Sequence, residues 1–294
     1  MTSPVRRQVP VSDGIISFLE WSAPAGAPVL VFSHANGFNA STYKTLLQPL
    51  AGRFRILAWD MRGHGETALP TDPRLLPGWR VFRDDLIRLL DALAIRADVL
   101  AGHSLGASAS LLAAAARPAI ARALVLAEPV MATDETALKA FVARQFGRAA
   151  TVNPLAGMAL KRRAEFASRA DAMKRFTGRG AFATWPAQMV ADYVETGLTP
   201  SGDGFRLACA PQWEAGAFSV FPFGMARLGS RIEAPVTMLT GTKGSATRDS
   251  VRDGFMRRHG HVRFVPVEGA THFLPMEHPD LVRAEILRAA GMEG

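Results

Sequence analysis

The sequence contains one cysteine, Cys209, among 294 residues. A single cysteine cannot form an intramolecular disulfide, and no second thiol or nearby histidine completes a zinc or redox motif around it. We interpret Cys209 as a small buried hydrophobic side chain. Long apolar runs are also missing, because charged residues and a proline interrupt the most apolar stretch, residues 111–126. The sequence therefore predicts no membrane span.

A targeting signal is not recognisable either. Residues 1–8 have no apolar core of signal-peptide length, which favours a cytoplasmic protein. Disorder is not expected, since 48% of the residues are hydrophobic and the 19 prolines are dispersed. The chain has no internal repeat and is long enough for one large core with an inserted segment.

Acidic residues are scarce in one part of the chain. Between residues 139 and 179, ten Lys and Arg residues stand against Glu165 and Asp171, so this stretch carries the same +8 as the whole chain. Such a charge can attract an anionic substrate or an anionic surface. Solvated helix faces in an Arg-rich chain are the favoured explanation of the charge, since no nucleic-acid motif accompanies it. We therefore expect no nucleic-acid partner and leave an anionic partner open.

The sequence does contain a repeated pattern of strand, loop and helix. An Asp-Gly turn at residues 13–14 separates two alternating runs and predicts a β-hairpin. The expected strands after it are residues 28–33, 54–59, 97–101, 123–127, 235–240 and 262–267, and the expected helices are residues 41–50, 79–93, 107–116 and about 279–290. Continuous apolar strands that alternate with helices indicate an α/β fold with a parallel sheet covered on both faces.

The strand signal disappears between residues 131 and 229. Helically spaced apolar residues from Leu138 to Phe146, and a stretch rich in Trp, Phe, Pro and Met, replace it. The predicted domains are residues 1–130 for the first part of the core, 131–229 for a helical cap and 230–294 for the second part of the core. A cap at this place would lie over the carboxyl ends of the strands, where α/β sheets bind ligands.

A G-x-S-x-G motif stands between an expected strand and an expected helix, at residues 102–106. This is the pattern of a nucleophile elbow, a strained turn that exposes a serine hydroxyl above the sheet. Gly102 and Gly106 carry no side chain that could clash in such a turn. Ser104 is therefore the expected nucleophile of acyl-transfer chemistry.

A serine hydroxyl needs a base, and His272 is the favoured candidate. It lies in the loop between the last expected strand and the last expected helix, at the same edge of the sheet as Ser104. His103 should point away from the serine hydroxyl. We interpret His34 and His64 as residues that fix loops, and the remaining histidines, His259, His261 and His278, as surface or capping residues.

With these motifs the chain resembles the α/β-hydrolase superfamily from about residue 28 to the C-terminal helix. Residues 34–38 (HANGF) are similar to the family's H-G-x-G oxyanion loop, and residues 60–65 (DMRGHG) to its D-x-R-G-x-G turn. Residues 269–272 (GATH) and 277–279 (EHP) are similar to its catalytic-histidine segment. The resemblance implies a mostly parallel eight-stranded sheet with helices on both faces, a helical cap after strand 123–127, and catalysis without cofactor or metal.

The acid of the triad is where the sequence departs from the family pattern. Members usually carry an Asp in a G-x-x-D segment after the seventh strand, and here Gly244 occupies that place. Some haloalkane dehalogenases and the coelenterazine luciferases instead place a Glu after the sixth strand, and this resemblance implies Glu128. A carboxylate at the end of an apolar strand is hard to explain as packing. The alternative acid is Asp249, which can also be explained as a helix N-terminal residue.

The oxyanion hole is expected to consist of the backbone N–H groups of Asn36 and Leu105. The dehalogenases that the chain resembles also have an Asn at the position of Asn36. Ser104 argues against dehalogenation, because a serine alkyl ether would not be hydrolysed. Six aromatic residues are candidates for an apolar substrate pocket or, with equal reason, for the core of the cap: Phe38, Trp185, Trp213, Phe218, Phe221 and Phe223.

The sequence thus predicts a serine hydrolase that cleaves small-molecule carboxylic esters with an apolar acyl or alcohol part through an acyl-enzyme. A lactonase, thioesterase, amidase or C–C bond hydrolase would use the same residues, because the cap and not the triad recognises the leaving group. Two other classes stay open: a ligand-binding or receptor protein on the same fold, and a cofactor-free haloperoxidase-like activity. The sequence leaves the oligomeric state undetermined.

Overall fold

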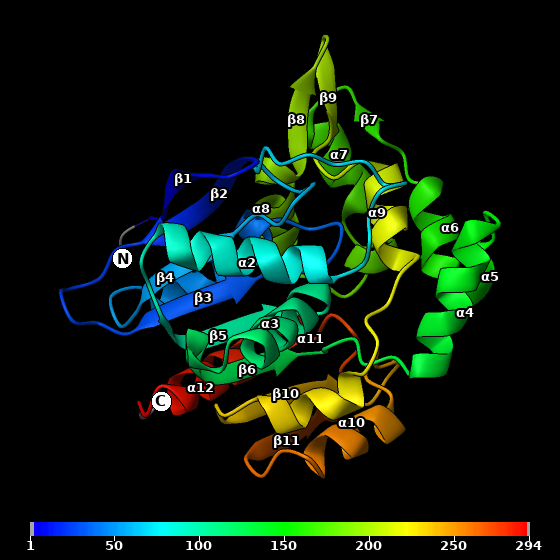
Figure 1. The fold of residues 1–294 in the computed structure, drawn as a ribbon. Helices are drawn as coiled ribbons and strands as arrows, with labels where there is room; N and C mark the ends of the chain where they lie inside the picture. The colour runs from blue at the N-terminus through cyan, green and yellow to red at the C-terminus, as the bar shows by residue number, and fades with distance from the viewer. Residues whose placement is uncertain (1–2, 293–294) are drawn as a thin grey trace.

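A computed structural model describes residues 3–292. Its main element is a sheet of eight strands in the order β1-β2-β4-β3-β5-β6-β10-β11 (Figure 1). The strands are β1 Val5–Val11, β2 Gly14–Trp21, β3 Val29–Ser33, β4 Arg55–Trp59, β5 Ala97–His103, β6 Ala121–Ala127, β10 Val236–Gly241 and β11 Val262–Val267. The pairs β1/β2 and β2/β4 are antiparallel and the others parallel. The predicted mostly parallel eight-stranded sheet is confirmed.

The central strands are apolar on both sides because packed layers cover both faces of the sheet. In β3, Val31 belongs to one hydrophobic cluster, while Leu30 and Phe32 belong to the cluster on the opposite face. Helices α2 (Arg80–Ala92), α3 (Leu105–Ala116) and α10 (Asp249–Met256) pack into the first cluster. Helices α1 (Lys44–Leu47), α11 (Leu274–Glu277) and α12 (Pro279–Ala289) pack into the second.

The predicted helix over residues 41–50 is divided into three short pieces. They are the 3₁₀ helix η1 (Ala40–Tyr43), α1, and the 3₁₀ helix η2 (Gln48–Leu50). Pro49 stands at the start of η2, where it removes a backbone donor and ends regular α-helix. Another 3₁₀ turn, η3 (Pro118–Ile120), joins α3 to β6.

The chain between β6 and β10 forms the insertion, which we define as Asp134 to Arg231. Its helices are α4 Asp134–Gln145, α5 Ala149–Val152, α6 Pro154–Leu160, α7 Arg169–Phe176, η4 Gly180–Phe182, α8 Ala187–Gly197, α9 Pro211–Phe218 and η5 Met225–Arg231. It also contains strands β7 Glu165–Phe166, β8 Leu198–Ser201 and β9 Gly204–Leu207, which form a separate antiparallel sheet in the order β7-β9-β8 (Figure 1).

These three strands correct the expectation of a purely helical insertion. The hairpin β8–β9 turns through Gly202 and Asp203, and Gly202 has a positive φ of 55°. A Gly-Asp turn between short runs is a hairpin signal, so the sequence carried a clue to this element. The predicted boundaries at residues 131 and 229 stay a prediction, and η5 crosses the second of them.

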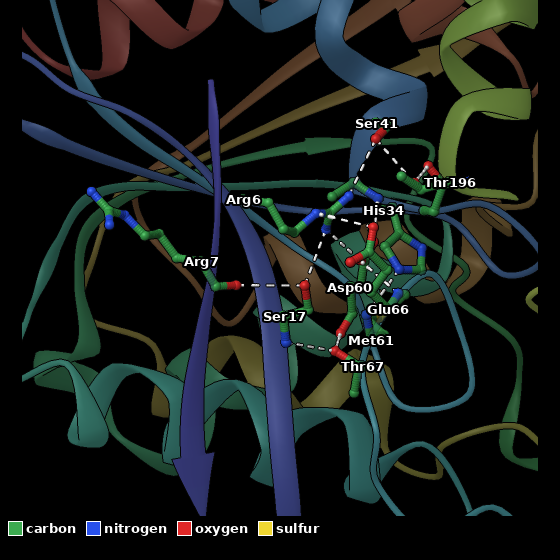
Figure 2. Close-up of polar contacts among 12 residues, drawn as sticks. Arg6, Arg7, Ser17, His34, Ser41, Asp60, Met61, Glu66, Thr67 and Thr196 are labelled. Carbon is green, nitrogen blue, oxygen red and sulfur yellow. Dashed lines mark hydrogen bonds and ion pairs between the residues drawn. The ribbon is translucent and has the colours of Figure 1, made fainter. Parts of the chain in front are cut away.

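A polar network joins the β1–β2 hairpin to the turn after β4 (Figure 2). The guanidinium of Arg6 lies 2.6 Å from the carboxylate of Asp60, which is fully buried. Asp60 also accepts hydrogen bonds from the backbone N–H groups of Ala40 and Glu66, at 2.7 and 3.1 Å. The D-x-R-G-x-G turn is therefore held by its own aspartate, which binds the segments on both sides of it.

Candidate active site

Ser104 lies between the last residue of β5 and the first residue of α3, with φ 55° and ψ −118°. A positive φ is strained for serine and is maintained only where the surroundings enforce it. A Cβ at Gly106 would lie 2.2 Å from the carbonyl oxygen of Ser33, and one at Gly102 would lie 2.8 Å from the backbone nitrogen of Ala107. Because only glycine fits at both places, the G-x-S-x-G sequence permits this tight connection of strand to helix.

His272 lies within hydrogen-bond distance of both Ser104 and Glu128. The Nε2 atom of His272 is 2.9 Å from the Oγ of Ser104, and its Nδ1 atom is 3.1 Å from the Oε2 of Glu128. An ionised carboxylate only accepts hydrogen bonds, so the ring proton belongs on Nδ1 and Nε2 is free to accept the serine proton. The structure thus brings together three residues that come from the ends of β5, β6 and the segment after β11.

The carboxylate of Glu128 is fully buried and has several donors. Its Oε1 accepts from the backbone N–H of Gly241 at 2.5 Å, and its Oε2 accepts from the Ser245 hydroxyl and the Ala246 N–H, each at 3.0 Å. These donors, together with His272, replace the hydration that burial removes. The loop after β10, where the family usually has its Asp, therefore supplies hydrogen-bond donors to Glu128.

Asp249 lies elsewhere. It is the first residue of α10, and its side chain is 81% exposed and forms an ion pair with Arg252 at 2.7 Å. Since the Nδ1 of His272 faces Glu128, nothing in this arrangement assigns Asp249 to the histidine. Asp249 thus lies at the N-terminus of a helix, which is the second explanation that the sequence analysis gave for it.

The loop after β3 is fixed by two histidines. His34 accepts a hydrogen bond from the N–H of Met61 at 2.9 Å, and His64 accepts one from the N–H of Gly37 at 3.0 Å. The side-chain amide of Asn36 donates to the carbonyl of Glu214 at 3.0 Å. These contacts confirm that both histidines fix loops, and they show that the Asn36 side chain binds the insertion.

The N–H of Leu105 belongs to the first turn of α3 and therefore has no acceptor within the helix. It directly follows Ser104, as an oxyanion donor must. Asn36 lies in the loop after β3, two residues beyond His34. The assignment of these two backbone N–H groups to an oxyanion hole stays a prediction.

A second set of hydrogen bonds joins the loop after β3 to the loop of His272. The N–H of Ala35 donates to the hydroxyl of Tyr43 at 3.1 Å, and that hydroxyl lies 2.7 Å from the Nδ1 of His103. The Nε2 of His103 lies 2.7 Å from the carbonyl of His272. Because a carbonyl only accepts, Nε2 carries the proton and Tyr43 donates to Nδ1. His103 thus points away from the serine hydroxyl, as predicted.

Two of the six aromatic candidates lie near His272. Phe38 and Trp185 pack edge to face with ring centroids 5.0 Å apart, and Trp185 packs against Phe273 at 5.8 Å. Phe273 directly follows His272 and is an aromatic neighbour of the site that the sequence analysis missed, although its adjacency to His272 was a signal. Phe182 and Tyr193 extend the same aromatic cluster.

The other four candidates do not join this cluster, and for Trp213 and Phe221 the contacts favour the second of the two alternatives that the sequence left open, a place in the core. Trp213 packs against Phe82 and donates its indole N–H to the carbonyl of Arg62 at 2.9 Å. Phe221 packs against Trp79, and it contacts the same hydrophobic cluster that contains Trp213. The remaining two are Phe218, which is half-buried, and Phe223, which is 46% exposed. Trp213, on α9, and Phe221, which follows that helix, therefore belong with the hydrophobic cluster on the face opposite Phe38.

Sequence reasoning also missed a buried ion pair beside the loop after β3. Arg162 pairs with Glu214 and donates to the hydroxyl of Tyr193 at 2.8 Å. A Cβ at Gly37 would lie only 2.5 Å from Glu214 Oε1. Arg162, counted among the solvated charges of the insertion, instead connects the insertion to the loop that carries Asn36.

The buried histidines predict an acid-sensitive fold. Burial lowers the pKa of His34 to about 4 and lowers the pKa of His64 and His103 well below the usual range. Each accepts a hydrogen bond through one ring nitrogen, so a proton there would remove an acceptor. Below about pH 6.5 the unfolded chain binds protons that the folded chain does not, and stability falls by roughly 1 kcal/mol per pH unit for each histidine.

We therefore expect the free energy of unfolding to drop by about 4 kcal/mol between pH 7 and pH 5.5. Urea unfolding followed by circular dichroism at the two pH values measures this difference. Burial raises the pKa of Asp60 and Asp85, and protonation of these two carboxyls would act in the opposite direction. Equal stability at both pH values would contradict the neutral state of these residues.

The comparisons with known proteins identify the family of the chain. A model of the alpha/beta hydrolase family matches residues 30–285, and the chain belongs to this family of hydrolases. It is 34% identical over 119 residues to the 2-(acetamidomethylene)succinate hydrolase of Mesorhizobium japonicum, covering 40% of this chain and 41% of the relative. It is 34% identical over 118 residues to the esterase Rv0045c of Mycobacterium tuberculosis, covering 40% and 38%.

The matched stretches thus span less than half the length of these curated relatives. The likeness to solved structures extends further: the crystal structure of E-2-(acetamidomethylene)succinate hydrolase superimposes with a TM-score of 0.79 at 23% identity, covering 98% of this chain and 99% of that one. This likeness shows the shared fold. In residues 3–292, no helix is long and apolar enough to cross a membrane.

Proposed function

We propose that the protein is a serine hydrolase that cleaves carboxylic esters through an acyl-enzyme, with Ser104 as nucleophile, His272 as general base and Glu128 as the orienting acid. The observation that carries this proposal is the continuous hydrogen-bonded series from Glu128 through His272 to Ser104, with distances of 3.1 and 2.9 Å. Both distances lie within hydrogen-bond reach, and the 2.9 Å between His272 and Ser104 is short enough for proton transfer. Membership of a hydrolase family supports the same chemistry.

The reaction follows from these positions. The Oγ of Ser104 attacks the ester carbonyl while its proton moves to Nε2 of His272, and the carbonyl oxygen becomes an oxyanion. The N–H groups of Leu105 and Asn36 would donate to that oxyanion. The C–O bond to the alcohol then breaks, and His272 returns the proton to the departing alcohol. Water repeats the sequence on the acyl-enzyme and releases the acid.

Glu128 acts without taking up a proton itself. Its negative charge stabilises the imidazolium that forms on His272, and its hydrogen bond holds the ring in the tautomer that presents Nε2 to the serine. The buried position of the carboxylate strengthens this effect, since water screens the interaction little.

The reacting ester is proposed to carry an apolar acyl or alcohol part. Phe38, Trp185 and Phe273 gather aromatic surface next to His272, and such surface binds apolar groups by burial. A serine nucleophile also separates this chain from chemistry that needs a hydrolysable alkyl-enzyme ester, as dehalogenation and epoxide opening do.

A panel of p-nitrophenyl esters from acetate to decanoate tests the proposal. We expect turnover by the purified protein with an optimum beyond acetate, and covalent labelling by a fluorophosphonate at Ser104. Matched thioester, lactone and anilide substrates measure whether the ester is preferred over the other acyl compounds that the same residues could cleave. Absence of both turnover and labelling would contradict the proposal and favour a ligand-binding protein on this fold.

A further inference from the structure

Helices α4 and α6 of the insertion have an inverted distribution of apolar side chains. The residues that α4 buries are Ala137 and Ala140, whereas Leu138, Phe141 and Val142 are exposed. In the same way α6 buries Ala156 and Ala159 and exposes its larger apolar residues, Leu155, Met158 and Leu160. A helix that packs only against its own protein buries its large apolar residues and exposes its polar ones. These two helices bury only alanines and expose their large apolar residues.

The exposed apolar side chains are concentrated on this part of the molecule. In residues 3–292, eleven large hydrophobic side chains are exposed, and seven of them lie between Leu138 and Leu160. The side chain of Phe146, one of these seven, is 75% exposed. Single exposed apolar residues are ordinary, but a contiguous group marks a surface that meets a partner. We call the surface formed by α4, α5 and α6 the α4–α6 face.

The α4–α6 face lies at the periphery of the fold. Figure 1 shows α4, α5 and α6 side by side at one edge of the molecule, away from the β1–β2 hairpin. A groove of about 790 Å³ runs between α4 and α5, and its lining includes Leu138, Val142 and Phe146 as well as the cations Lys139 and Arg148. Apolar and cationic side chains therefore share one surface.

The charge of this surface is positive and partly uncompensated. Lys139 forms an ion pair with Glu135 at 2.5 Å. Arg148 and Lys161 are exposed, and neither forms an ion pair with any acid in the part of the chain that the structure describes. The +8 of residues 139–179 adds a positive field around them. A partner that complements this surface must combine apolar matter with negative charge.

We propose that the α4–α6 face binds the surface of a bilayer that contains anionic lipid. Leu138, Phe141, Phe146 and their neighbours enter the boundary between headgroups and acyl chains, while Arg148 and Lys161 contact the anionic headgroups. Amphipathic helices with apolar and cationic residues bind membranes in this manner, in the plane of the interface and without spanning it. The proposal goes beyond ester hydrolysis and places the protein where water-insoluble substrates accumulate.

Co-sedimentation of the full-length protein with vesicles tests the proposal. One set of vesicles is pure phosphatidylcholine and the other contains about one-third phosphatidylglycerol. We expect binding to the second set at least about tenfold tighter, since each cation near an anionic surface contributes roughly a factor of five. Raising the salt concentration should weaken this binding, because salt screens the attraction.

Two variants and a control locate the surface. Phe146→Asp should weaken binding to the anionic vesicles by about tenfold or more, since it replaces an inserted ring with a charge of the wrong sign. Arg148→Glu should weaken it and reduce its salt dependence. Val5→Asp is the matched control, because Val5 is an exposed apolar residue of β1, and it should leave binding unchanged. Hydrolysis of a short soluble ester and the thermal unfolding midpoint report whether each variant folds.

Three outcomes would overturn the proposal. The first is the absence of binding to either vesicle. The second is binding that Phe146→Asp and Val5→Asp affect equally. The third is self-association that Phe146→Asp abolishes, measured by sedimentation velocity, which would show that a second copy of this chain covers the α4–α6 face. Vesicle binding and self-association can both be measured even if the protein does not hydrolyse esters.

Discussion

Replacing Ser104 with alanine is expected to lower kcat for ester hydrolysis by about 10⁵- to 10⁶-fold. The expectation follows from the geometry: the Oγ of Ser104 is the atom 2.9 Å from the Nε2 of His272, and no acyl-enzyme can form without it. The measurement is a comparison of kcat for the wild type and Ser104→Ala on the best p-nitrophenyl ester, with fluorophosphonate labelling of both. Residual hydrolysis should match the level that binding and oxyanion donors alone support.

The neighbouring Ser108 provides a control for Ser104→Ala. Its hydroxyl lies on the buried side of α3 and contacts the carbonyls of Ser104 and Val130, at 3.2 and 3.1 Å. Ser108→Ala should therefore change stability by about 1 kcal/mol and leave fluorophosphonate labelling intact. Turnover in Ser104→Ala within tenfold of the wild type would contradict the assignment of the nucleophile.

The second large effect is expected for Glu128→Gln, with a fall in kcat of about 10⁴-fold. The amide has nearly the shape of the carboxylate, but it no longer stabilises the imidazolium of His272 and can hold the ring in the wrong tautomer. Its NH₂ group would also face N–H donors, since Gly241 and Ala246 both donate to the present carboxylate. We therefore expect a lower unfolding midpoint beside the loss of turnover.

Asp249→Asn is the matched test for Glu128→Gln, because it makes the same chemical change in the other acid that the sequence offers. Its ion pair with Arg252 is exposed, and exposed pairs contribute about 0–1 kcal/mol. The kcat of Asp249→Asn should thus lie within twofold of the wild type. The reverse pattern, with Asp249→Asn inactive and Glu128→Gln active, would show that the start of α10 moves so that Asp249 becomes the acid that orients His272.

The strands of the main sheet could be predicted because their sequences are short, mainly apolar or alternating runs bounded by turn residues. The run at residues 262–267 has the same bounds as β11. Glu128 could be found through the resemblance to hydrolase relatives that place a Glu after the sixth strand, and its place at the end of a buried strand supports it, because packing does not explain a carboxylate there. Such features can be predicted because they depend on residues that are adjacent in the sequence and on burial.

The insertion was harder to predict because its contacts join residues that are distant in sequence. Nothing local distinguishes Arg162, which pairs with a glutamate 52 positions away, from the solvated arginines around it. The aromatic content of α9 was visible, but composition does not determine to which face of the sheet Trp213 turns. The two residues of β7 are too few to give any alternating pattern.

The hydrogen bonds from Ala35 through Tyr43 and His103 to the carbonyl of His272 tie two loops of the site into one body. One loop carries the proposed oxyanion donor Asn36 and the other carries the proposed base. A displacement of either loop therefore has to stretch a contact of 2.7 Å inside a fully buried environment. Folding therefore already orients the polar groups that the proposed reaction needs. These groups have to move little when charge develops on the substrate, and the reorganisation energy of that step is small.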